Sequence, residues 1–571
     1  MKDQESILEV NGLHIRFGSR EASPIVADLS FTLQSGRTLA IVGESGSGKS
    51  LTALALMGLL PGGMEMEGDL RLNTGDRSHP LNISGNADIW QEIRGKEMGM
   101  VFQEPMSSLN PIMKIGDQLL ETISLHQRLP RSAAKKLATD WLAKVQLPSP
   151  EKIFNRYPHQ LSGGQKQRVM IAMAMCNNPR LLIADEPTTA LDVTVQQEII
   201  ALMQQLQETT GTAMIFITHD LALASMIADD LLVLFRGKMM EYGKSGDILR
   251  QPRNAYTKAL LACRPTPAHK GERLPVVSDF IPSEQKEETA PVRREHKDLQ
   301  PLSTSRKMTE PLLRASKLRI WFTEERNWFG KSLSYFKAVD DVSFDLWPGE
   351  ILGLVGESGC GKSTLSRSLI GLVPVREGSV IFNGEDLSGL DEKGWRRVRK
   401  DIQMIFQDPF ASLNPRMTVG DILAEPLRSH RIVNPKEIDR EVKRLTALVQ
   451  LPAGSEKRYP HQFSGGQRQR IGIARALALR PRLLICDESV SALDVSVQAQ
   501  ILNLLKDLQQ EFSLSYLFIS HNLAVVHYIS DRVMVMQSGK IVESGGAEQV
   551  LHHPEQAYTR KLIASEPVMK L

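Results

Sequence analysis

The sequence predicts an α/β protein made of two copies of one domain. The chain contains an internal repeat: for example, GESGSGKS at Gly43 recurs as GESGCGKS at Gly356. Short apolar strands such as RTLAIVG, PRLLIAD and AMIFITH alternate with amphipathic helices, a pattern typical of a largely parallel sheet. A chain of 571 residues is also too long for a single hydrophobic core.

The repeat sets the domain organisation. From the SGGQ segments onward the copies keep a constant offset of 302 residues, whereas the first copy has 60 residues and the second 51 between the phosphate loop and the later Gln. The nine extra residues of the first copy fall in a polar segment, where a surface insertion costs little stability. We assign residues 1–263 and 311–571 to the two domains. Residues 264–310, rich in Pro and charge and without periodicity, predict a flexible linker.

Composition excludes several classes of protein. Hydrophobic content of 42% and charged content of 24% are ordinary for a globular protein, and a net charge of +3 predicts no nucleic-acid partner. No stretch approaches ~18 uncharged apolar residues, so no transmembrane helix is expected. The start MKDQESILEV is not a secretory signal. The four Cys have no CxxC spacing, which favours a reducing cytosol over a disulfide framework or a cysteine-ligated zinc site.

The first chemical motif is a phosphate loop. Gly43 to Ser50 fits G-x-x-x-x-G-K-[ST], follows an apolar strand over 39–42 and opens a helix over 50–59. Backbone N–H groups of such a loop surround a β-phosphate, Lys49 neutralises phosphate oxygens, and Ser50 offers a hydroxyl to Mg²⁺. The candidate nucleotide-binding residues of the two loops are Gly43, Ser45, Gly46, Gly48, Lys49, Ser50, Leu51, and Gly356, Ser358, Gly359, Gly361, Lys362, Ser363, Thr364.

Polar side chains that end other apolar strands supply the remaining chemistry. Asp185 is expected to hold Mg²⁺ and Glu186 to polarise the attacking water, because carboxyl ends of parallel strands meet at one edge of the sheet. His219 and Gln103 also follow strands, and an amide there can contact Mg²⁺ or the water. The matching residues of the second copy are Asp487, Glu488, His521 and Gln407, with Ser363 and Gln407 as further metal candidates.

A second glycine-rich element is the strongest discriminator. The two copies of Ser-Gly-Gly-Gln are Ser162, Gly163, Gly164, Gln165 and Ser464, Gly465, Gly466, Gln467. A protein with a phosphate loop does not need this element for its own phosphates, yet Ser-Gly-Gly at a helix start is a ready anion site. Two anion sites per copy predict a nucleotide held between the copies.

These motifs, in this order, resemble the ATP-binding cassette (ABC) ATPases over nearly the whole chain outside the linker. The segments FQ[ED]P…SLNP and RYPHQ further resemble the subfamily that powers bacterial import of oligopeptides, dipeptides, glutathione, microcin C and nickel or metallophores. A chain with both cassettes looks most like the fused glutathione- and microcin-type members. Each domain is then expected to hold a RecA-like core, an antiparallel β subdomain and a helical subdomain.

The resemblance also implies partners and a location. The two cassettes would pair head to tail around two ATP molecules, each phosphate loop facing the other copy's Ser-Gly-Gly-Gln. Two transmembrane permease subunits and an extracytoplasmic solute-binding protein would complete an importer, with this chain peripheral at the cytoplasmic face of the inner membrane. Phe17 and Phe322 lie where the family stacks an aromatic ring on adenine, although an aromatic in an early strand is as often a core residue.

Two other functions remain open from the residues alone. A soluble tandem cassette that acts on ribosomes also lacks membrane spans, but it usually carries a long helical linker, which the prolines of this linker forbid. A DNA-repair ATPase would be expected to show zinc-ligand cysteine pairs. Neither alternative fits the sequence as well as a transporter subunit does.

The copies differ at two informative places. Pro187 restricts Glu186 towards extended backbone, whereas Ser489 leaves Glu488 less constrained, so we expect two competent sites with unequal rates. Cys360 lies inside the second phosphate loop beside a helix N-terminus, where the thiolate is favoured. Cys360 is therefore either a reactive thiol at the second site or an inert small residue.

Overall fold

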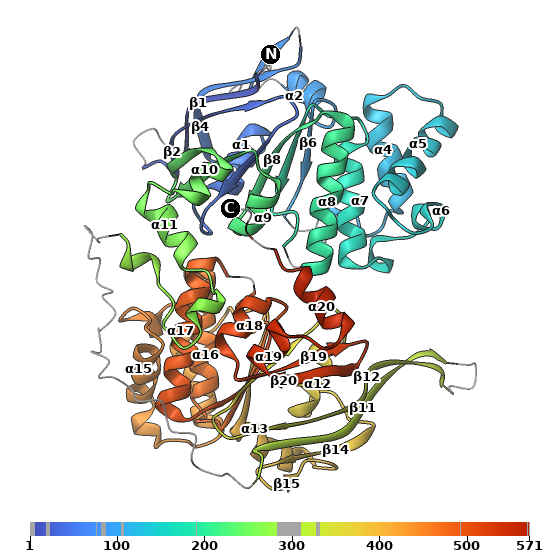
Figure 1. Ribbon diagram of the computed structural model, residues 1–571. Helices are drawn as coiled ribbons and strands as arrows, with labels where there is room; N and C mark the ends of the chain where they lie inside the picture. The colour runs from blue at the N-terminus through green and yellow to red at the C-terminus, as the bar shows by residue number, and fades with distance from the viewer. Residues whose placement is uncertain are drawn as a thin grey trace. The chain divides into compact units, whose positions relative to one another are not determined.

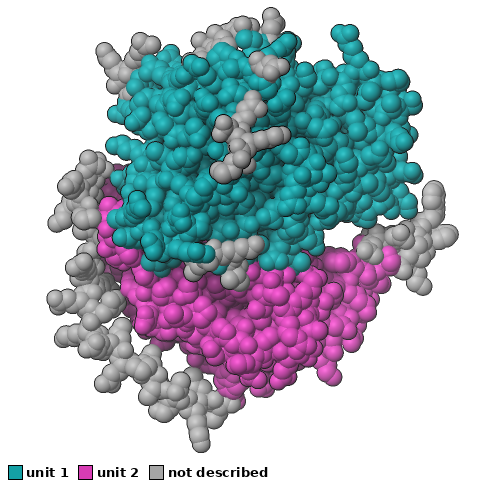
Figure 2. Space-filling model, turned by 45° about the horizontal axis from the view of Figure 1, so that its top comes forward, with its two compact units in different colours: residues 1–262, 567–571 teal, residues 263–566 magenta. Residues whose placement is uncertain are grey.

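The computed structural model describes residues 6–18, 23–75, 77–81, 87–103, 108–189, 191–281, 310–326, 332–491, 493–567 and 569. The chain divides into two compact units. Unit 1 comprises residues 1–262 and 567–571, and unit 2 comprises residues 263–566 (Figure 2).

Unit 1 is an α/β layer structure on one ten-stranded sheet, as Figure 1 shows. Its strands are β1 Ser6–Phe17, β2 Val26–Gln34, β3 Thr38–Val42, β4 Met64–Asn73, β5 Ser78–Pro80, β6 Met98–Val101, β7 Leu181–Asp185, β8 Ala213–Thr218, β9 Asp230–Phe235 and β10 Lys238–Lys244. Its helices are α1 Lys49–Leu56, α2 Ala87–Ile93, α4 Ile115–His126, α5 Arg131–Lys144, α6 Pro150–Phe154, η1 Pro158–Gln160, α7 Gly163–Met175, α8 Val193–Thr210, α9 Leu221–Ile227, α10 Ser245–Arg250 and α11 Ala255–Ala262.

The sheet order is β5-β4-β1-β2-β10-β9-β3-β8-β7-β6. Strands β9, β3, β8, β7 and β6 are parallel, whereas β2, β1, β4 and β5 form the antiparallel end. Every residue of β3, β7 and β8 is buried, as expected for parallel strands covered on both faces. Helices α4 and α5 pack on each other and on α7, away from the antiparallel end (Figure 1). The predicted core, antiparallel part and helical part are all confirmed.

Unit 2 repeats this plan with the sheet in two parts. Its strands are β11 Leu313–Arg326, β12 Ser332–Leu346, β13 Ile351–Val355, β14 Glu377–Phe382, β15 Glu385–Asp386, β16 Ile402–Ile405, β17 Leu483–Asp487, β18 Ser515–Ile519, β19 Arg532–Gln537 and β20 Lys540–Gly546. Its helices are η2 Pro267–His269, η3 Val277–Asp279, α12 Lys362–Leu369, α13 Glu392–Asp401, α14 Val419–Ser429, η4 Pro435–Glu437, α15 Ile438–Leu448, η5 Ser455–Lys457, η6 Pro460–Gln462, α16 Gly465–Leu477, α17 Val495–Phe512, α18 Leu523–Ile529, α19 Ala547–His552 and α20 Ala557–Ala564.

The six-stranded sheet of unit 2 has the order β16-β17-β18-β13-β19-β20, and the four-stranded sheet has the order β12-β11-β14-β15. In both units the central parallel strand precedes the phosphate loop. Strand β3 lies between β8 and β9, and β13 lies between β18 and β19. The carboxyl ends of three neighbouring parallel strands therefore meet at one edge of each sheet, which brings the predicted site residues together.

Residues 264–281, which we predicted to lie in the flexible linker, instead pack on unit 2. Leu274 is 1% exposed and belongs to the hydrophobic core of that unit. Its backbone N–H donates to Asn503 Oδ1 at 3.0 Å, and its carbonyl accepts from Asn503 Nδ2 at 2.9 Å. The Tyr528 hydroxyl donates to the carbonyl of Glu272 at 3.0 Å. A buried leucine, a paired amide and the apolar side chains of Val276 and Val277 thus hold a segment whose composition predicts a tether.

Candidate active sites

Each phosphate loop is fixed between a buried strand and the first turn of a helix. Gly48 caps the N-terminus of α1 with φ +100°, and Gly361 caps α12 with φ +111°. L-residues rarely adopt this conformation. A Cβ on Gly48 would also lie 2.6 Å from Val26 Cγ2. Only glycine therefore lets the loop turn into the helix here, which leaves the helix N-terminus open to an anion.

The two loop lysines are held in the same way. Lys49 Nζ donates to the carbonyls of Gly43 and Glu44 at 2.8 and 3.0 Å. Lys362 Nζ donates to the carbonyls of Gly356 and Glu357 at 2.7 and 2.9 Å. Both lysines are at most 5% exposed. The ammonium groups are thus desolvated and placed at the loop, where phosphate oxygens are their natural partners.

A hydroxyl and a carboxylate meet beside each lysine. Ser50 Oγ donates to Asp185 Oδ1 at 3.0 Å, and Ser363 Oγ donates to Asp487 Oδ1 at 3.0 Å. Burial raises the pKa of Asp185 to about 6 and also raises the pKa of Asp487, and the serine hydrogen bonds only partly oppose this. A buried carboxylate next to a hydroxyl is an oxygen ligand set that Mg²⁺ accepts, and a cation there would offset the burial cost.

In unit 1 three side chains converge on one oxygen of Glu186. Gln103 Nε2 donates to Glu186 Oε2 at 3.3 Å, Thr189 Oγ1 donates to it at 2.8 Å, and His219 Nδ1 lies 3.4 Å from it. Burial alone would raise the pKa of Glu186, but His219, Thr189 and the charge of Lys49 outweigh it and lower the pKa to about 2. Glu186 is consequently ionised at neutral pH and oriented by its neighbours.

Unit 2 builds the same arrangement with one partner fewer. Gln407 Nε2 donates to Glu488 Oε2 at 2.7 Å, and His521 Nδ1 lies 3.6 Å from it. Burial opposes these partners, yet the pKa of Glu488 is still lowered, chiefly by His521. Ser491, which replaces Thr189, donates instead to the backbone carbonyl of Glu488 at 2.9 Å. The second carboxylate therefore lacks the hydroxyl that holds the first.

The predicted backbone difference between the two glutamates is wrong. Glu186 has φ +46° and Glu488 has φ +47°, both left-handed rather than extended, whether Pro or Ser follows. Each amide donates to a neighbouring strand, Glu186 N to Ile217 O and Glu488 N to Ile519 O, at 3.0 Å. Strand contacts thus override the local preference that Pro187 imposes. Such strained non-glycine residues gather at active sites.

The Ser-Gly-Gly-Gln segments begin helices α7 and α16. Ser162 N donates to Gln165 Oε1 at 3.2 Å and Gln165 N donates to Ser162 Oγ at 3.3 Å, a reciprocal capping box. Ser464 and Gln467 repeat it at 3.1 and 3.4 Å. A Cβ on Gly164 would meet Val195 Cγ1 at 2.8 Å, so close packing on α8 requires glycine there. Both segments therefore lie at helix starts as predicted, and anion binding there stays a prediction.

The two aromatic residues expected to stack on adenine are exposed. Phe17, at the end of β1, is 62% exposed, and Phe322, in β11, is 45% exposed. Both rings therefore lie outside the core, and each is accessible to a flat ligand.

The remaining candidates of the phosphate loops lie on the turns and first helical residues around Lys49 and Lys362: Ser45, Gly46 and Leu51, and Ser358, Gly359 and Thr364.

Of the two alternatives for Cys360, the structure favours the inert residue. Cys360 is 7% exposed, and burial raises the pKa of its thiol despite the neighbouring charge of Lys362. Its side chain packs with the core of unit 2 that surrounds the phosphate loop. Desolvation outweighs the helix N-terminus, which leaves Cys360 as a buried neutral thiol.

Sequence reasoning missed two supports of these sites. Tyr256 Oη in α11 accepts a hydrogen bond from Glu44 N at 3.2 Å, and Tyr558 Oη in α20 accepts one from Glu357 N at 3.2 Å. Both tyrosines lie in a repeated segment, AYTKAL in the first copy and AYTRKL in the second. The sequence of these segments does not indicate a contact with the phosphate loop. Thr189 was also missed, because its role depends on the geometry of Glu186.

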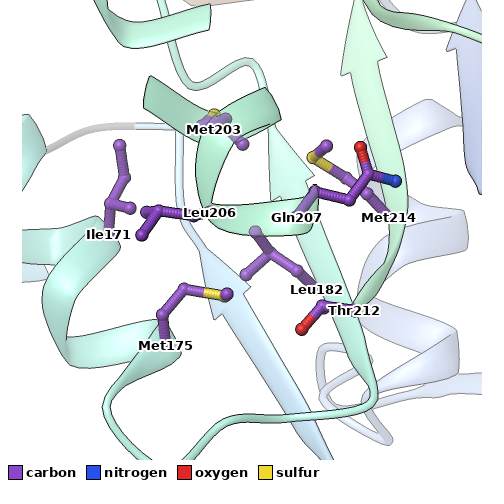
Figure 3. Close-up of a pocket in the computed structure, with 8 residues that line it drawn as sticks. All are labelled: Ile171, Met175, Leu182, Met203, Leu206, Gln207, Thr212 and Met214. Atoms are coloured by element: carbon purple, nitrogen blue, oxygen red, sulfur yellow. The ribbon is translucent and has the colours of Figure 1, made fainter. Parts of the chain in front are cut away.

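An internal cavity in unit 1 is unrelated to these sites. It has a volume of about 10 Å³ and lies among side chains of α7, α8, β7 and β8. Figure 3 shows mostly apolar side chains around it, namely Ile171, Met175, Leu182, Met203, Leu206 and Met214, with Gln207 and Thr212. It is a packing void at the scale of a single water molecule.

Comparison with known proteins decides the family. The ABC transporter family model matches residues 26–189 and 339–491, which include both phosphate loops and both strand-end carboxylate pairs. The chain belongs to the ABC transporter family. A second model, the C-terminal region of oligopeptide/dipeptide transporters, matches residues 240–289 and 542–570. This ABC protein is thus an ATPase subunit of a transporter of the peptide-importing type, and both units are ABC ATPase domains.

Relatives of this ABC ATPase cover its whole length. The glutathione import ATP-binding protein GsiA of Pectobacterium atrosepticum is 45% identical over 100% of this chain and 90% of its own length. That of Escherichia coli strain K12 is 47% identical over 99% of this chain and 90% of its own length. A solved ATP-binding cassette in a post-hydrolysis dimer with ADP and phosphate is 24% identical, covers 41% of this chain and 98% of its own, and has a TM-score of 0.38. Among the helices that the structure describes, none is long and apolar enough to cross a membrane.

Proposed function

We propose that this ABC ATPase drives import of glutathione or a closely related small peptide. The observation that carries the proposal is the duplicated constellation of lysine, serine, paired carboxylates, glutamine and histidine, in which each pair of groups meets in both units. The extent of similarity to glutathione import ATP-binding proteins supports the choice of cargo. Two transmembrane permease subunits and an extracytoplasmic solute-binding protein complete the transporter, and the ATPase acts at the cytoplasmic face of the inner membrane.

At each site the chain's residues orient the reactants. Lys49 leaves the carbonyls of its loop for phosphate oxygens, and Gln103 and His219 hold Glu186. Ionised Glu186 accepts a hydrogen bond from the attacking water, whose oxygen forms the new bond to the γ-phosphorus as the bond to the β,γ-bridging oxygen breaks. The products are ADP, which keeps the β,γ-bridging oxygen, and phosphate, which keeps one proton of the water while the other is released to solvent. Held by Gln103 and His219, the Glu186 carboxylate orients this water towards the γ-phosphorus.

Mg²⁺ is the metal that fits these residues. Ser50 and Asp185 at the first site, and Ser363 and Asp487 at the second, would hold it, with Gln103 and Gln407 as further oxygen donors. Bound there, the ion neutralises charge on the phosphates. Phe17 and Phe322 would stack on the adenine rings.

We further propose that the ATP sites are composite and that the two domains pair head to tail. Lys49, Ser50, Asp185 and Glu186 would share one ATP with the helix start at Ser464–Gln467. Lys362, Ser363, Asp487 and Glu488 would share the other with Ser162–Gln165. The exposed helix starts of α7 and α16 support this, since a phosphate loop already supplies its own domain with an anion site.

The test is reconstitution of the full chain with its permeases in vesicles, with the solute-binding protein added. Glutathione-loaded binding protein is expected to stimulate ATPase several-fold and to drive glutathione uptake. The double variant Glu186→Gln, Glu488→Gln should do neither while still binding ATP. Stimulation by a different peptide alone would refute the cargo. Co-sedimentation with ribosomes and no permease-dependent membrane association would refute a transporter role.

A further inference from the structure

Three side chains with metal-binding donors gather on two packed helices of unit 2. His527 lies in α18, and Glu548 and His552 lie in α19. His527 Nε2 is 2.8 Å from Glu548 Oε2, and His552 Nε2 is 3.6 Å from Glu548 Oε1. All three donor atoms lie within 4.8 Å of one another. Helices α18 and α19 are neighbours in unit 2, so the cluster joins two separate elements (Figure 1).

The arrangement has the features of a metal site. Glu548 and His552 are four residues apart and lie on one face of α19, while His527 approaches from α18. The two imidazole rings meet edge to face, with centroids 4.9 Å apart. Ligands of tetrahedral Zn²⁺ at 2.0–2.1 Å bonds are about 3.4 Å apart, so a modest rotation of the exposed Glu548 and His552 side chains closes the site.

His527 is suited to the role of the inner ligand. Its side chain is only 5% exposed, and its Nε2 atom faces the Glu548 carboxylate at 2.8 Å. Its Nδ1 atom is buried and makes no hydrogen bond within the described residues, so Glu548 is the polar contact of the ring. On binding, Nε2 gives its lone pair to the ion and the single ring proton resides on Nδ1.

The first domain lacks this cluster. At the constant offset of 302 residues, His527, Glu548 and His552 correspond to Ser225, Gly246 and Arg250. The fold and the ATP site therefore do not require the three ligands, because the first domain builds both without them. The ammonium of Lys270, in the segment that packs on unit 2, lies within electrostatic range of His527 and Glu548 and opposes a bound cation.

We propose that His527, Glu548 and His552 bind one divalent transition-metal ion, with Zn²⁺ as the best-fitting species, and that the ion links α18 to α19. Two imidazoles and one carboxylate favour Zn²⁺ over Mg²⁺ and Ca²⁺, which prefer all-oxygen ligand sets. Helix α18 begins two residues after His521, so the ion would steady the helix that follows this histidine of the second ATP site. The proposal does not depend on the transported solute.

The experiment is a Zn²⁺ titration of the full chain without an affinity tag, free of nucleotide and in excess Mg²⁺. Other histidines and cysteines contribute a background shared by all variants, so the difference between variants is decisive. Wild type is expected to bind one equivalent of Zn²⁺ at this cluster, and so is the control His553→Gln, which alters the exposed neighbour of His552. Glu548→Gln and His552→Gln should lose this equivalent or bind it more than about 10-fold more weakly. Lys270→Gln should bind it more tightly.

Thermal unfolding supplies a second readout. Zn²⁺ is expected to raise the melting temperature of wild type and His553→Gln but not that of Glu548→Gln or His552→Gln. The shift that Zn²⁺ causes in each protein is compared, because Glu548 and His552 also contact the buried His527 ring without the metal. Equal Zn²⁺ stoichiometry and affinity in Glu548→Gln, His552→Gln and His553→Gln would overturn the proposal, and the cluster would then be an ordinary ion pair.

Discussion

At the scale of single residues, one hydroxyl contact distinguishes the surroundings of Glu186 from those of Glu488. Glu186 and Glu488 share the same backbone conformation and the same glutamine and histidine partners. Thr189 adds a 2.8 Å hydrogen bond to Glu186, whereas Ser491 turns to a backbone carbonyl. A hydrogen bond to a charged group contributes about 1.5–3 kcal/mol, enough to change how firmly a carboxylate is oriented. We therefore expect unequal turnover at the two sites because of these side-chain contacts and not because of Pro187.

We expect Glu186→Gln and Glu488→Gln each to lower ATPase of the assembled transporter, by unequal factors, with Glu186→Gln the more damaging. Loss of a positioned carboxylate removes roughly 10²-fold or more at its own site. Steady-state ATPase in vesicles measures the difference. Thr189→Val removes the hydroxyl that holds Glu186 and should narrow the difference between the two single variants. Ser491→Ala should leave that difference unchanged, because Ser491 does not hydrogen-bond the Glu488 carboxylate. Full activity in Glu488→Gln would mean that the second site only binds nucleotide.

At the scale of elements, the segment after α11 is a part of unit 2 and not a tether. The side-chain amide of Asn503 hydrogen-bonds both the backbone N–H and the backbone carbonyl of Leu274, as a neighbouring strand would. The first domain has Ala201 and Met226 where the second has Asn503 and Tyr528, so only the second domain can hold the segment this way. The composition of residues 264–281 could not predict this, because docking depends on one leucine and on polar groups more than 200 residues away.

We predict that Asn503→Leu releases this segment. The substitution leaves the buried N–H and carbonyl of Leu274 without partners, at a cost of about 1–3 kcal/mol each. Trypsin cleavage after Lys270 and Arg273 should accelerate at least about tenfold. Asp507→Asn removes only an exposed ion pair with Arg273 and should change the rate little. Unchanged cleavage in Asn503→Leu would show that the docking is held by other contacts.

The core elements of the ATP sites, by contrast, could be predicted from the sequence. Apolar strands that end in Asp-Glu, His or Gln, and a glycine loop before a helix, fix which side chains meet at the edge of a parallel sheet. What could not be predicted was the burial of Cys360, the left-handed backbone of Glu186 and Glu488, and the tyrosines behind the loops. Each of these depends on packing between distant segments, which local preference does not encode.

At the scale of the whole molecule, the central claim is that two ATP sites are shared between the domains. Each of the two domains carries one complete phosphate loop and one helix start with the sequence Ser-Gly-Gly-Gln. A composite arrangement makes each domain contribute one half of both sites. Closure on ATP and opening after hydrolysis would then be a single motion that the permeases can follow.

The most direct measurement is the number of ATP molecules occluded per chain in the Glu186→Gln, Glu488→Gln background. Adding Lys49→Ala with Ser464→Arg damages the two halves of one composite site, so about one ATP should remain. Adding Lys49→Ala with Ser162→Arg damages both sites, so none should remain. The reverse result, with one ATP retained in the Lys49→Ala, Ser162→Arg protein and none in the other, would contradict head-to-tail sharing.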